Sequence, residues 1–178
     1  MKGSGRTFAI YWLLPIAYCL FNSATAQSNT RKIPAADVKT TDGKTFNTSK
    51  ISNDGKPIII SFWATWCKPC KKELDAIAEN YEELVKETGV KLIAVSIDDA
   101  RSSEKAIADA KIKGWTYEVF IDQNQDFKRA MNVNNIPHTF LVNGNGEIIW
   151  QHNSYAEGDE DKLFEVVKKV AKGEKVGD

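Results

Sequence analysis

Two cysteines separated by two residues have the clearest chemical capacity in this chain. They lie in the sequence Trp66-Cys67-Lys68-Pro69-Cys70, between an apolar run and a helical pattern, which predicts that they start a helix. Side chains at positions i and i+3 of a helix are neighbours, with Cβ atoms about 5–6 Å apart, and a disulfide requires about 3.5–4.5 Å. A slightly tightened first turn would let the thiols bond or separate, so the pair is predicted to be a redox centre.

The same position favours a thiolate at Cys67. A helix N-terminus has unpaired N–H groups and a partial positive charge, and both stabilise an anionic sulfur. Lys68, Lys71 and Lys72 add positive charge nearby. Pro69 is compatible with the first helical turn, because an N–H group there has no helical partner to lose.

The first 26 residues have the pattern of a secretory signal peptide. Lys2 and Arg6 are followed by an apolar stretch at residues 7–21, and Ala24-Thr25-Ala26 offers a cleavage site. An uncleaved membrane anchor is the alternative, although the stretch is shorter than the ~20 residues that a spanning helix needs. The protein is therefore expected to be exported, periplasmic or extracytoplasmic, with membrane association only if the signal is retained.

Charge gives no indication of an anionic partner. The chain has 24 basic and 24 acidic residues, and loss of the signal peptide would remove only basic ones. A protein without a basic excess is not expected to bind nucleic acid or an anionic membrane surface.

Cysteine usage also narrows the possibilities. Cys19 would leave with the signal peptide, so only Cys67 and Cys70 remain. As a structural staple this pair would close a loop too short to restrain the unfolded chain much. A zinc site would need a second ligand pair, and His138 and His152 are isolated, so no metal is expected.

The remaining chain has the pattern of one α/β domain. Asp42-Gly43 predicts a hairpin with a two-residue turn, and the continuously apolar residues 57–63 predict a central strand that delivers Cys67 to the edge of a sheet. Helical spacing of apolar residues continues to about Thr88, and Gly89 ends the helix. The other predicted elements are strands at 92–97, 117–121, 138–142 and 147–151 and helices at 102–111, 125–131 and 159–171. This order favours layers around a largely parallel sheet.

The glycines at positions 144 and 146 do not indicate a phosphate-binding loop. They lie between two predicted strands, with no helix following. A loop that cradles phosphates needs that helix N-terminus, so no nucleotide or other cofactor is expected.

Three segments resemble the thioredoxin superfamily and, within it, the exported TlpA/ResA-like thiol–disulfide oxidoreductases. They are residues 61–73 around the cysteines, residues 135–141 with the sequence Asn-Ile-Pro-His-Thr-Phe-Leu, and the Asp42-Gly43-Lys44 hairpin. The resemblance implies a thioredoxin-like three-layer α/β/α sandwich with a mixed central sheet and an added N-terminal β-hairpin. The expected organisation is a signal peptide at 1–26, a flexible tether at 27–35, the thioredoxin-like domain at 36–173 and a tail at 174–178.

The resemblance also implies roles for particular residues. Cys67 would be the exposed nucleophile and Cys70 the buried resolving thiol, and the two would form the redox disulfide. The Ile136–Pro137 bond would be cis and packed against the dithiol. A free backbone edge beside Pro137 would receive the substrate peptide as an added strand.

The chain departs from thioredoxin itself at two core positions. Ser61 replaces a buried Asp and Ala94 replaces its Lys partner, so no orphan charge is left. Glu73 instead matches a Glu that lies at the site of TlpA/ResA-like proteins, and its charge is expected to raise the thiol pKa. The alternative for Glu73 is a solvated residue paired with a lysine.

Aromatic residues and His138 are weaker candidates. Trp66 is expected to frame the site, whereas Trp63 is interpreted as a core residue. His138 could influence the dithiol or be a hydrogen-bonded bystander, and His152 has no assigned role.

The function that follows is reduction of disulfides in exported proteins. An upstream membrane thiol would supply the electrons, and the task could be cytochrome c maturation or another one. An oxidase or isomerase on the same fold and a metal-handling binding module are the alternatives. A peroxidase is disfavoured, because the Thr-x-x-Cys loop of peroxiredoxins is absent.

Overall fold

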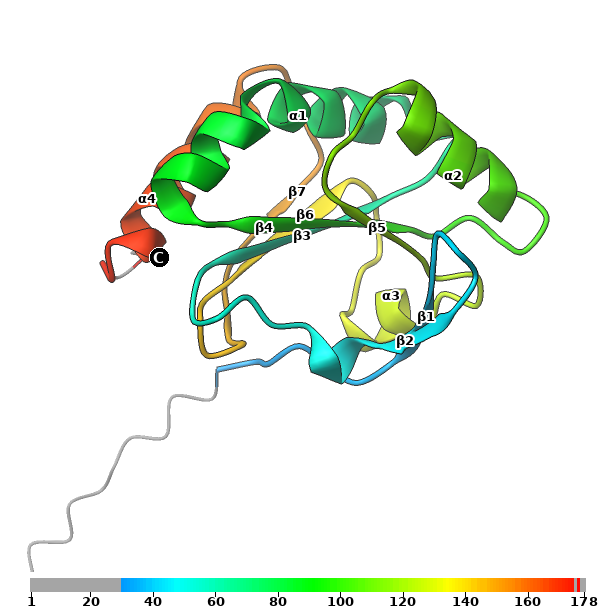
Figure 1. The fold of residues 1–178 in the computed structure, drawn as a ribbon, viewed down its shortest axis with the longest axis horizontal. Helices are drawn as coiled ribbons and strands as arrows, with labels where there is room; N and C mark the ends of the chain where they lie inside the picture. Colours follow the sequence, from blue (N-terminus) through cyan, green and yellow to red (C-terminus); the bar gives the residue numbers. More distant parts are fainter. Residues whose placement is uncertain (1–29, 175, 177–178) are drawn as a thin grey trace, which may run out of the picture.

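The computed structural model describes residues 30–174 and 176, which form one α/β domain (Figure 1). The predicted signal peptide therefore lies outside the described residues. The strands are β1 (Asp37–Thr40), β2 (Thr45–Asn47), β3 (Ile58–Trp63), β4 (Lys91–Ser96), β5 (Glu118–Ile121), β6 (His138–Val142) and β7 (Ile148–Asn153). The helices are α1 (Lys68–Thr88), α2 (Ser103–Ile112), α3 (Asp126–Ala130) and α4 (Asp159–Ala171), with a 3₁₀ turn η1 (Thr48–Lys50). Among the described residues, no helix has both the length and the apolar character needed to cross a bilayer.

The seven strands form one mixed sheet in the order β2-β1-β5-β4-β3-β6-β7. The three inner strands β3, β4 and β5 are parallel, and the strands added on either side are antiparallel. All six residues of β3 are buried, as its continuous apolar sequence predicts. The mixed sheet with a central β3 is therefore confirmed.

The sheet is covered on both faces, which gives the three layers expected. Helices α1, α2 and α4 lie on one face and α3 lies on the other, and the edge hairpin of β1 and β2 bends toward the α3 side (Figure 1). Alternation along β3 assigns its side chains to these faces. Phe62 packs on Phe127 of α3, with ring centroids 5.3 Å apart, while Ser61 and Trp63 face the layer that contains α1.

Helix α1 has the limits that its sequence predicts. Leu74, Ile77 and Leu84 form its buried face. At the C-terminal end Gly89 adopts a left-handed conformation with φ of 66°, and its N–H donates to the carbonyl of Val85 at 2.8 Å. Glycine is suited to this position because it has no Cβ to clash in that conformation.

The hairpin of β1 and β2 extends the sheet at one edge, as expected, but its turn is longer than the two residues predicted. The N–H of Thr40 donates to the carbonyl of Lys44 at 2.9 Å, and Gly43 has a positive φ of 84°. A three-residue loop with a left-handed glycine is the next commonest hairpin connection, and the Asp-Gly signal does not distinguish the two.

Residues 30–35, expected to be part of a flexible tether, are instead packed against the domain. The N–H of Ile148 donates to the carbonyl of Arg31 at 2.8 Å, and the N–H of Ile33 donates to that of Gly146 at 3.3 Å. The Arg31 guanidinium lies 5.4 Å from the ring centroid of Phe140. An edge strand such as β7 has unpaired backbone groups that a polar segment can pair with, and composition alone does not reveal this.

Candidate active site

The two cysteines lie where β3 ends and α1 begins. Their sulfur atoms are bonded, with the Cα atoms 5.4 Å apart, so the predicted Cys67–Cys70 disulfide is present. The N–H of Cys67 donates to the carbonyl of Ala64 at 3.0 Å, which closes the short loop between the strand and the helix. The central strand therefore delivers the pair to the carboxyl edge of the sheet.

Cys67 is the N-cap residue of α1, and its sulfur accepts the N–H of Cys70 at 3.3 Å. The sulfur thus occupies the position where an N-cap side chain normally satisfies a free helical N–H. The partial positive charge of the helix N-terminus is directed at it, which supports the predicted stabilisation of a thiolate.

The two cysteines differ less in exposure than the resemblance implies. Cys67 is 5% exposed and Cys70 is 0% exposed. Cys67 is therefore the more accessible of the two, but it is not an exposed residue while the disulfide is formed. Its sulfur is turned inward, because it is bonded to Cys70 and accepts the N–H of that residue.

The Ile136–Pro137 peptide bond is cis, as the resemblance implied. Pro137 directly precedes β6, and the pairing of His138 with Phe62 sets it beside the end of β3, where the cysteine loop begins. The Pro137 carbonyl accepts the N–H of Ser154 at 3.0 Å, so it is not free. Within the part of the chain that the structure describes, the backbone of Ile136 has no hydrogen-bond partner.

Glu73 is buried between α1 and the sheet, with 4% of its surface exposed. One carboxyl oxygen accepts the hydroxyl of Thr139 at 2.8 Å, and the other accepts the hydroxyl of Ser61 at 3.2 Å. The alternative of a solvated Glu73 paired with a lysine is therefore wrong. Because Glu73 follows Cys70 by three residues on the same helix, the two side chains lie on neighbouring positions of its surface.

Burial raises the pKa of Glu73 from 4.5 to about 7. The hydroxyl donors of Thr139 and Ser61 oppose this increase, and the negative charges of Asp159 and Glu160 add to it. A carboxyl group with this pKa exists in both protonation states near neutral pH. It can therefore change its charge in the pH range in which thiols exchange.

The positions of the missing thioredoxin charge pair are side by side in the sheet. Ser61 pairs with Ala94 between β3 and β4, and both are fully buried. A buried ionisable group is supplied to these positions by the helix instead, because the Glu73 carboxyl accepts the hydroxyl of Ser61.

The residues around the disulfide differ in solvent exposure and in charge pairing. Trp66 is 69% exposed, and Lys68 and Pro69 are also exposed. Lys71 pairs with Asp109 of α2 at 3.5 Å, so its charge is shared with a neighbouring carboxylate. The structure therefore keeps Trp66 and Lys68 on the surface beside Cys67.

Trp63 is a core residue, as interpreted from the sequence. It has no exposed surface, and its ring packs edge-on against Trp115 at 5.0 Å. Its contribution is to the packing beneath α1.

The two histidines are bound to neighbouring side chains. His138 contacts Gln151 through Nε2 at 3.2 Å and stacks on Phe140 at 4.2 Å, and burial lowers its pKa. His152 contacts Asp159 at 3.3 Å. Across residues 30–174, no group of three or more His, Cys, Asp or Glu side chains is arranged to hold a metal ion.

Sequence reasoning missed a second buried carboxyl group near the dithiol. Asp98 follows β4 and is 2% exposed, and both of its oxygens accept hydrogen bonds from Thr65 in the cysteine loop. The signal that could have revealed it is positional, because polar residues that follow neighbouring parallel strands meet at the same edge of a sheet.

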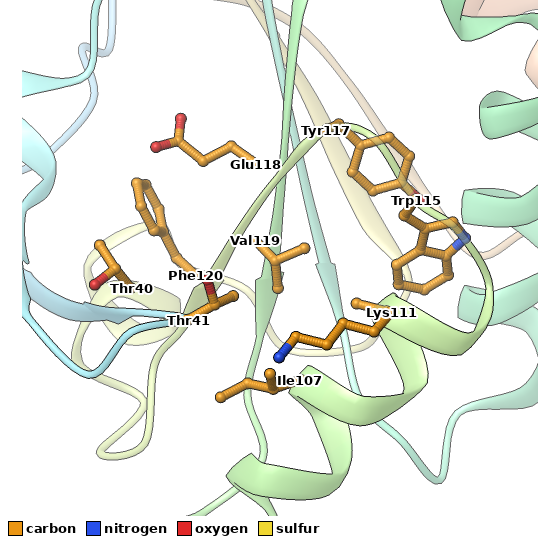
Figure 2. Close-up of a pocket in the computed structure, with 10 residues that line it drawn as sticks. Thr40, Thr41, Ile107, Lys111, Trp115, Tyr117, Glu118, Val119 and Phe120 are labelled. Atoms are coloured by element: carbon orange, nitrogen blue, oxygen red, sulfur yellow. The ribbon is translucent and has the colours of Figure 1, made fainter.

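A surface hollow of about 270 Å³ lies elsewhere on the domain (Figure 2). Ile107 and Lys111 of α2 and Trp115 form one side, and the first residues of β5 form another. The residues that line the hollow include none from the cysteine loop and none from residues 135–139. The hollow is therefore not part of the dithiol site.

A family model described as AhpC/TSA family matches residues 30–151. Sporulation thiol-disulfide oxidoreductase A of Bacillus subtilis is 30% identical over 146 residues, which are 80% of this chain and 86% of that protein. Thiol-disulfide oxidoreductase ResA of Geobacillus kaustophilus is 36% identical over 94 residues. That match spans 53% of this chain and about half, 52%, of the relative. The predicted resemblance to the ResA group is confirmed by these relatives.

The solution structure of an uncharacterized thioredoxin-like protein from Porphyromonas gingivalis is also similar. It is 51% identical, with a TM-score of 0.72, and the alignment covers 81% of this chain and 95% of that one. The predicted thioredoxin-like fold is therefore confirmed.

Proposed function

The chain belongs to the AhpC/TSA family, and from this premise we propose that it is a thiol–disulfide oxidoreductase that reduces disulfides of exported proteins. The observation that carries the proposal is the bonded Cys67–Cys70 pair with the Cys67 sulfur at the N-terminus of α1. Relatives named thiol-disulfide oxidoreductase support the same activity.

The reaction is two successive thiol–disulfide exchanges. In the reduced protein the Cys67 thiolate attacks one sulfur of the client disulfide, which forms a mixed disulfide and releases the other client sulfur as a thiolate that takes up a proton. The Cys70 thiol then loses its proton and attacks the Cys67 sulfur, which closes the internal disulfide and releases the second client thiol. The client gains two electrons and two protons, and Cys67 and Cys70 lose them.

The substrate backbone binds beside the cis peptide bond. The unpaired backbone of Ile136 supports this proposal, because an extended peptide can add to free N–H and carbonyl groups as a further strand. Trp66, exposed next to Cys67, offers an apolar surface to the residues flanking the client cysteine.

Glu73 tunes the thiols through its charge. When ionised, it opposes a thiolate on the same helix and raises the thiol pKa, and when protonated it does not. Its own pKa of about 7 places this change near neutral pH.

The protein acts outside the cytoplasm, and a membrane thiol donor reduces its Cys67–Cys70 disulfide again. The location outside the cytoplasm is supported by the signal-peptide pattern of residues 1–26, in which Lys2 and Arg6 precede an apolar stretch. Cytochrome c maturation is one task that such a reductase could serve.

The test is to trap the mixed disulfide. In a Cys70→Ser variant the resolving thiol is gone, so Cys67 should remain bonded to a client, and the adduct should disappear on addition of dithiothreitol. The Cys67→Ser variant is the control and should form no such adduct. Failure of the reduced wild-type protein to react at Cys67 with an alkylating reagent would overturn the proposal.

The direction of electron flow needs a separate measurement. Reduction potentials on this fold extend from about −270 to about −120 mV, which corresponds to roughly 7 kcal/mol for two electrons. Equilibration with glutathione should give a value near the reducing end. A strongly oxidising value would identify an oxidase or isomerase instead.

A further inference from the structure

The backbone ladder between β3 and β4 ends just before the cysteine loop. Its last rung is the N–H of Ile97, which donates to the carbonyl of Trp63 at 2.9 Å. Beyond this point no further backbone hydrogen bond joins the two segments in the described part of the chain. The side chain of Asp98 then spans the gap that a further backbone rung would have closed.

Asp98 holds Thr65 through two hydrogen bonds. One of its oxygens accepts the backbone N–H of Thr65 at 2.9 Å, and the other accepts the Thr65 hydroxyl at 2.8 Å. The hydroxyl of Ser96 donates to the first oxygen at 2.8 Å and accepts the N–H of Asp98 at 3.1 Å. Asp98 is thus itself fixed to β4, and through it the loop is fixed to the sheet.

These groups are removed from water. Asp98 is 2% exposed, Thr65 6% and Ser96 0%. A buried polar group that loses its partner cannot replace it with solvent, so each of these bonds is costly to break. The arrangement is therefore a rigid attachment, in contrast to a surface contact that opens and closes freely.

The attachment continues to the reactive sulfur. Thr65 is followed by Trp66 and Cys67, the N–H of Cys67 donates to Ala64 at 3.0 Å, and the Cys67 sulfur accepts the N–H of Cys70 at 3.3 Å. We propose that Asp98 is a positioning residue that, through Thr65, fixes the cysteine loop so that the Cys67 thiol is held ready to bond to Cys70. This inference rests on the proposed redox function.

The consequence is a shift in the equilibrium between dithiol and disulfide. A loop that is already fixed in the reduced protein loses little freedom when the internal disulfide closes, so the effective concentration of one thiol at the other is high. Loosening the loop gives the reduced form more freedom, and the disulfide becomes easier to reduce. A substitution that destabilises both redox states equally does not change this equilibrium.

The experiment measures the equilibrium with glutathione, in which two glutathione thiols become one glutathione disulfide as the Cys67–Cys70 disulfide becomes two thiols. Thr65→Val removes the hydroxyl donor, and Asp98→Asn removes one of the two acceptors. Both should lower the equilibrium constant for forming the internal disulfide about tenfold, which is about 30 mV toward a more oxidising potential. Thr65→Ser keeps both bonds and should stay within about twofold of the wild-type protein.

Asp122 provides the matched control. It is 1% exposed and follows β5 at the same edge of the sheet, but its oxygens accept the N–H groups of Phe127 at 3.3 Å and Lys128 at 2.8 Å in α3. Asp122→Asn should lower the thermal midpoint of unfolding and leave the glutathione equilibrium within about twofold of wild type.

Three results would overturn the inference. One is an equal change in potential for Asp98→Asn and Asp122→Asn, which would indicate general destabilisation. Another is a changed reduction potential for Asp98→Asn with a wild-type potential for Thr65→Val, which would indicate an effect of the Asp98 charge. The third is a wild-type value for both Thr65→Val and Asp98→Asn. Failure of the wild-type protein to equilibrate with glutathione would instead contradict the proposed function, so the two failures are distinguishable.

Discussion

Replacing Glu73 with glutamine should change how the stability of the protein depends on pH. The carboxyl group is 4% exposed, and burial raises its pKa from 4.5 to about 7 in the folded protein. Below pH 4.5 it is protonated in both the folded and the unfolded chain and has no effect. As the pH rises toward 7 the unfolded chain ionises first, so the free energy of unfolding falls, and above about pH 7 the loss is complete.

The size of this loss follows from the two pKa values. They differ by about two and a half pH units, and each unit corresponds to about 1.36 kcal/mol, so Glu73 should remove about 3 kcal/mol of stability between pH 4.5 and pH 8. Glutamine has nearly the same shape and does not ionise. The variant should therefore lack this part of the pH dependence, whatever the constant cost of burying its amide.

The assay is urea unfolding of the oxidised protein at half-unit intervals from pH 4.5 to 8.5. Keeping the disulfide formed removes the thiols from the titration, and other groups cancel in the difference between the two proteins. Glu79→Gln, at an exposed position of the same helix, is the control and should follow the wild-type curve. A difference between wild type and Glu73→Gln that does not vary with pH would refute the reasoning.

Three further outcomes are expected. Trp63→Ala should lower the free energy of unfolding by about 3–5 kcal/mol, because the side chain is fully buried. Trp66→Ala should change the free energy of unfolding by less than about 0.5 kcal/mol and should slow reduction of a protein disulfide, because this side chain is exposed beside Cys67. Equal midpoints of urea unfolding for the two variants would contradict this. Gly144→Ala should lower the free energy of unfolding by about 1–3 kcal/mol, because a Cβ at this position would lie 2.0 Å from the carbonyl oxygen of Gly55. Unchanged stability would show that the loops carrying Gly144 and Gly55 can move apart freely. Thr139→Val removes a donor to Glu73 and should raise the carboxyl pKa above about 7 in an NMR titration; a lower value would contradict the assigned bond.

Much of the fold could be predicted because the determining signals are local. The apolar run at residues 57–63 predicted the central strand β3. The glycine at position 89 predicted the end of α1, and it adopts the left-handed conformation that glycine favours there. The disulfide followed from the spacing of Cys67 and Cys70 on one helical turn. Each of these depends on residues within a few positions of one another.

The surroundings of the dithiol could be predicted only in part, because their partners are distant in sequence. Glu73 was identified, but its bonds to Ser61 and Thr139 join three separate elements, and the raised pKa depends on that burial. Asp98 was not identified, since its partner Thr65 lies 33 positions away. Hydrophobic periodicity has no signal for such contacts, which depend on strand order and register.

Glu73 and Asp98, the two buried carboxyl groups near the dithiol, differ in the kind of hydrogen-bond donor that each one accepts. They are bonded to different positions of the sheet, Glu73 to Ser61 on β3 and Asp98 to Ser96 at the end of β4. Glu73 accepts side-chain hydroxyls alone, and its pKa of about 7 lets it exchange a proton without moving the backbone. Asp98 accepts a backbone N–H as well as hydroxyls, so a change in its bonding would move the loop that carries Cys67. Under the two proposed roles, charge and geometry at the thiols would be controlled by different residues, so substitutions of Glu73 and of Asp98 should be separable in their effects.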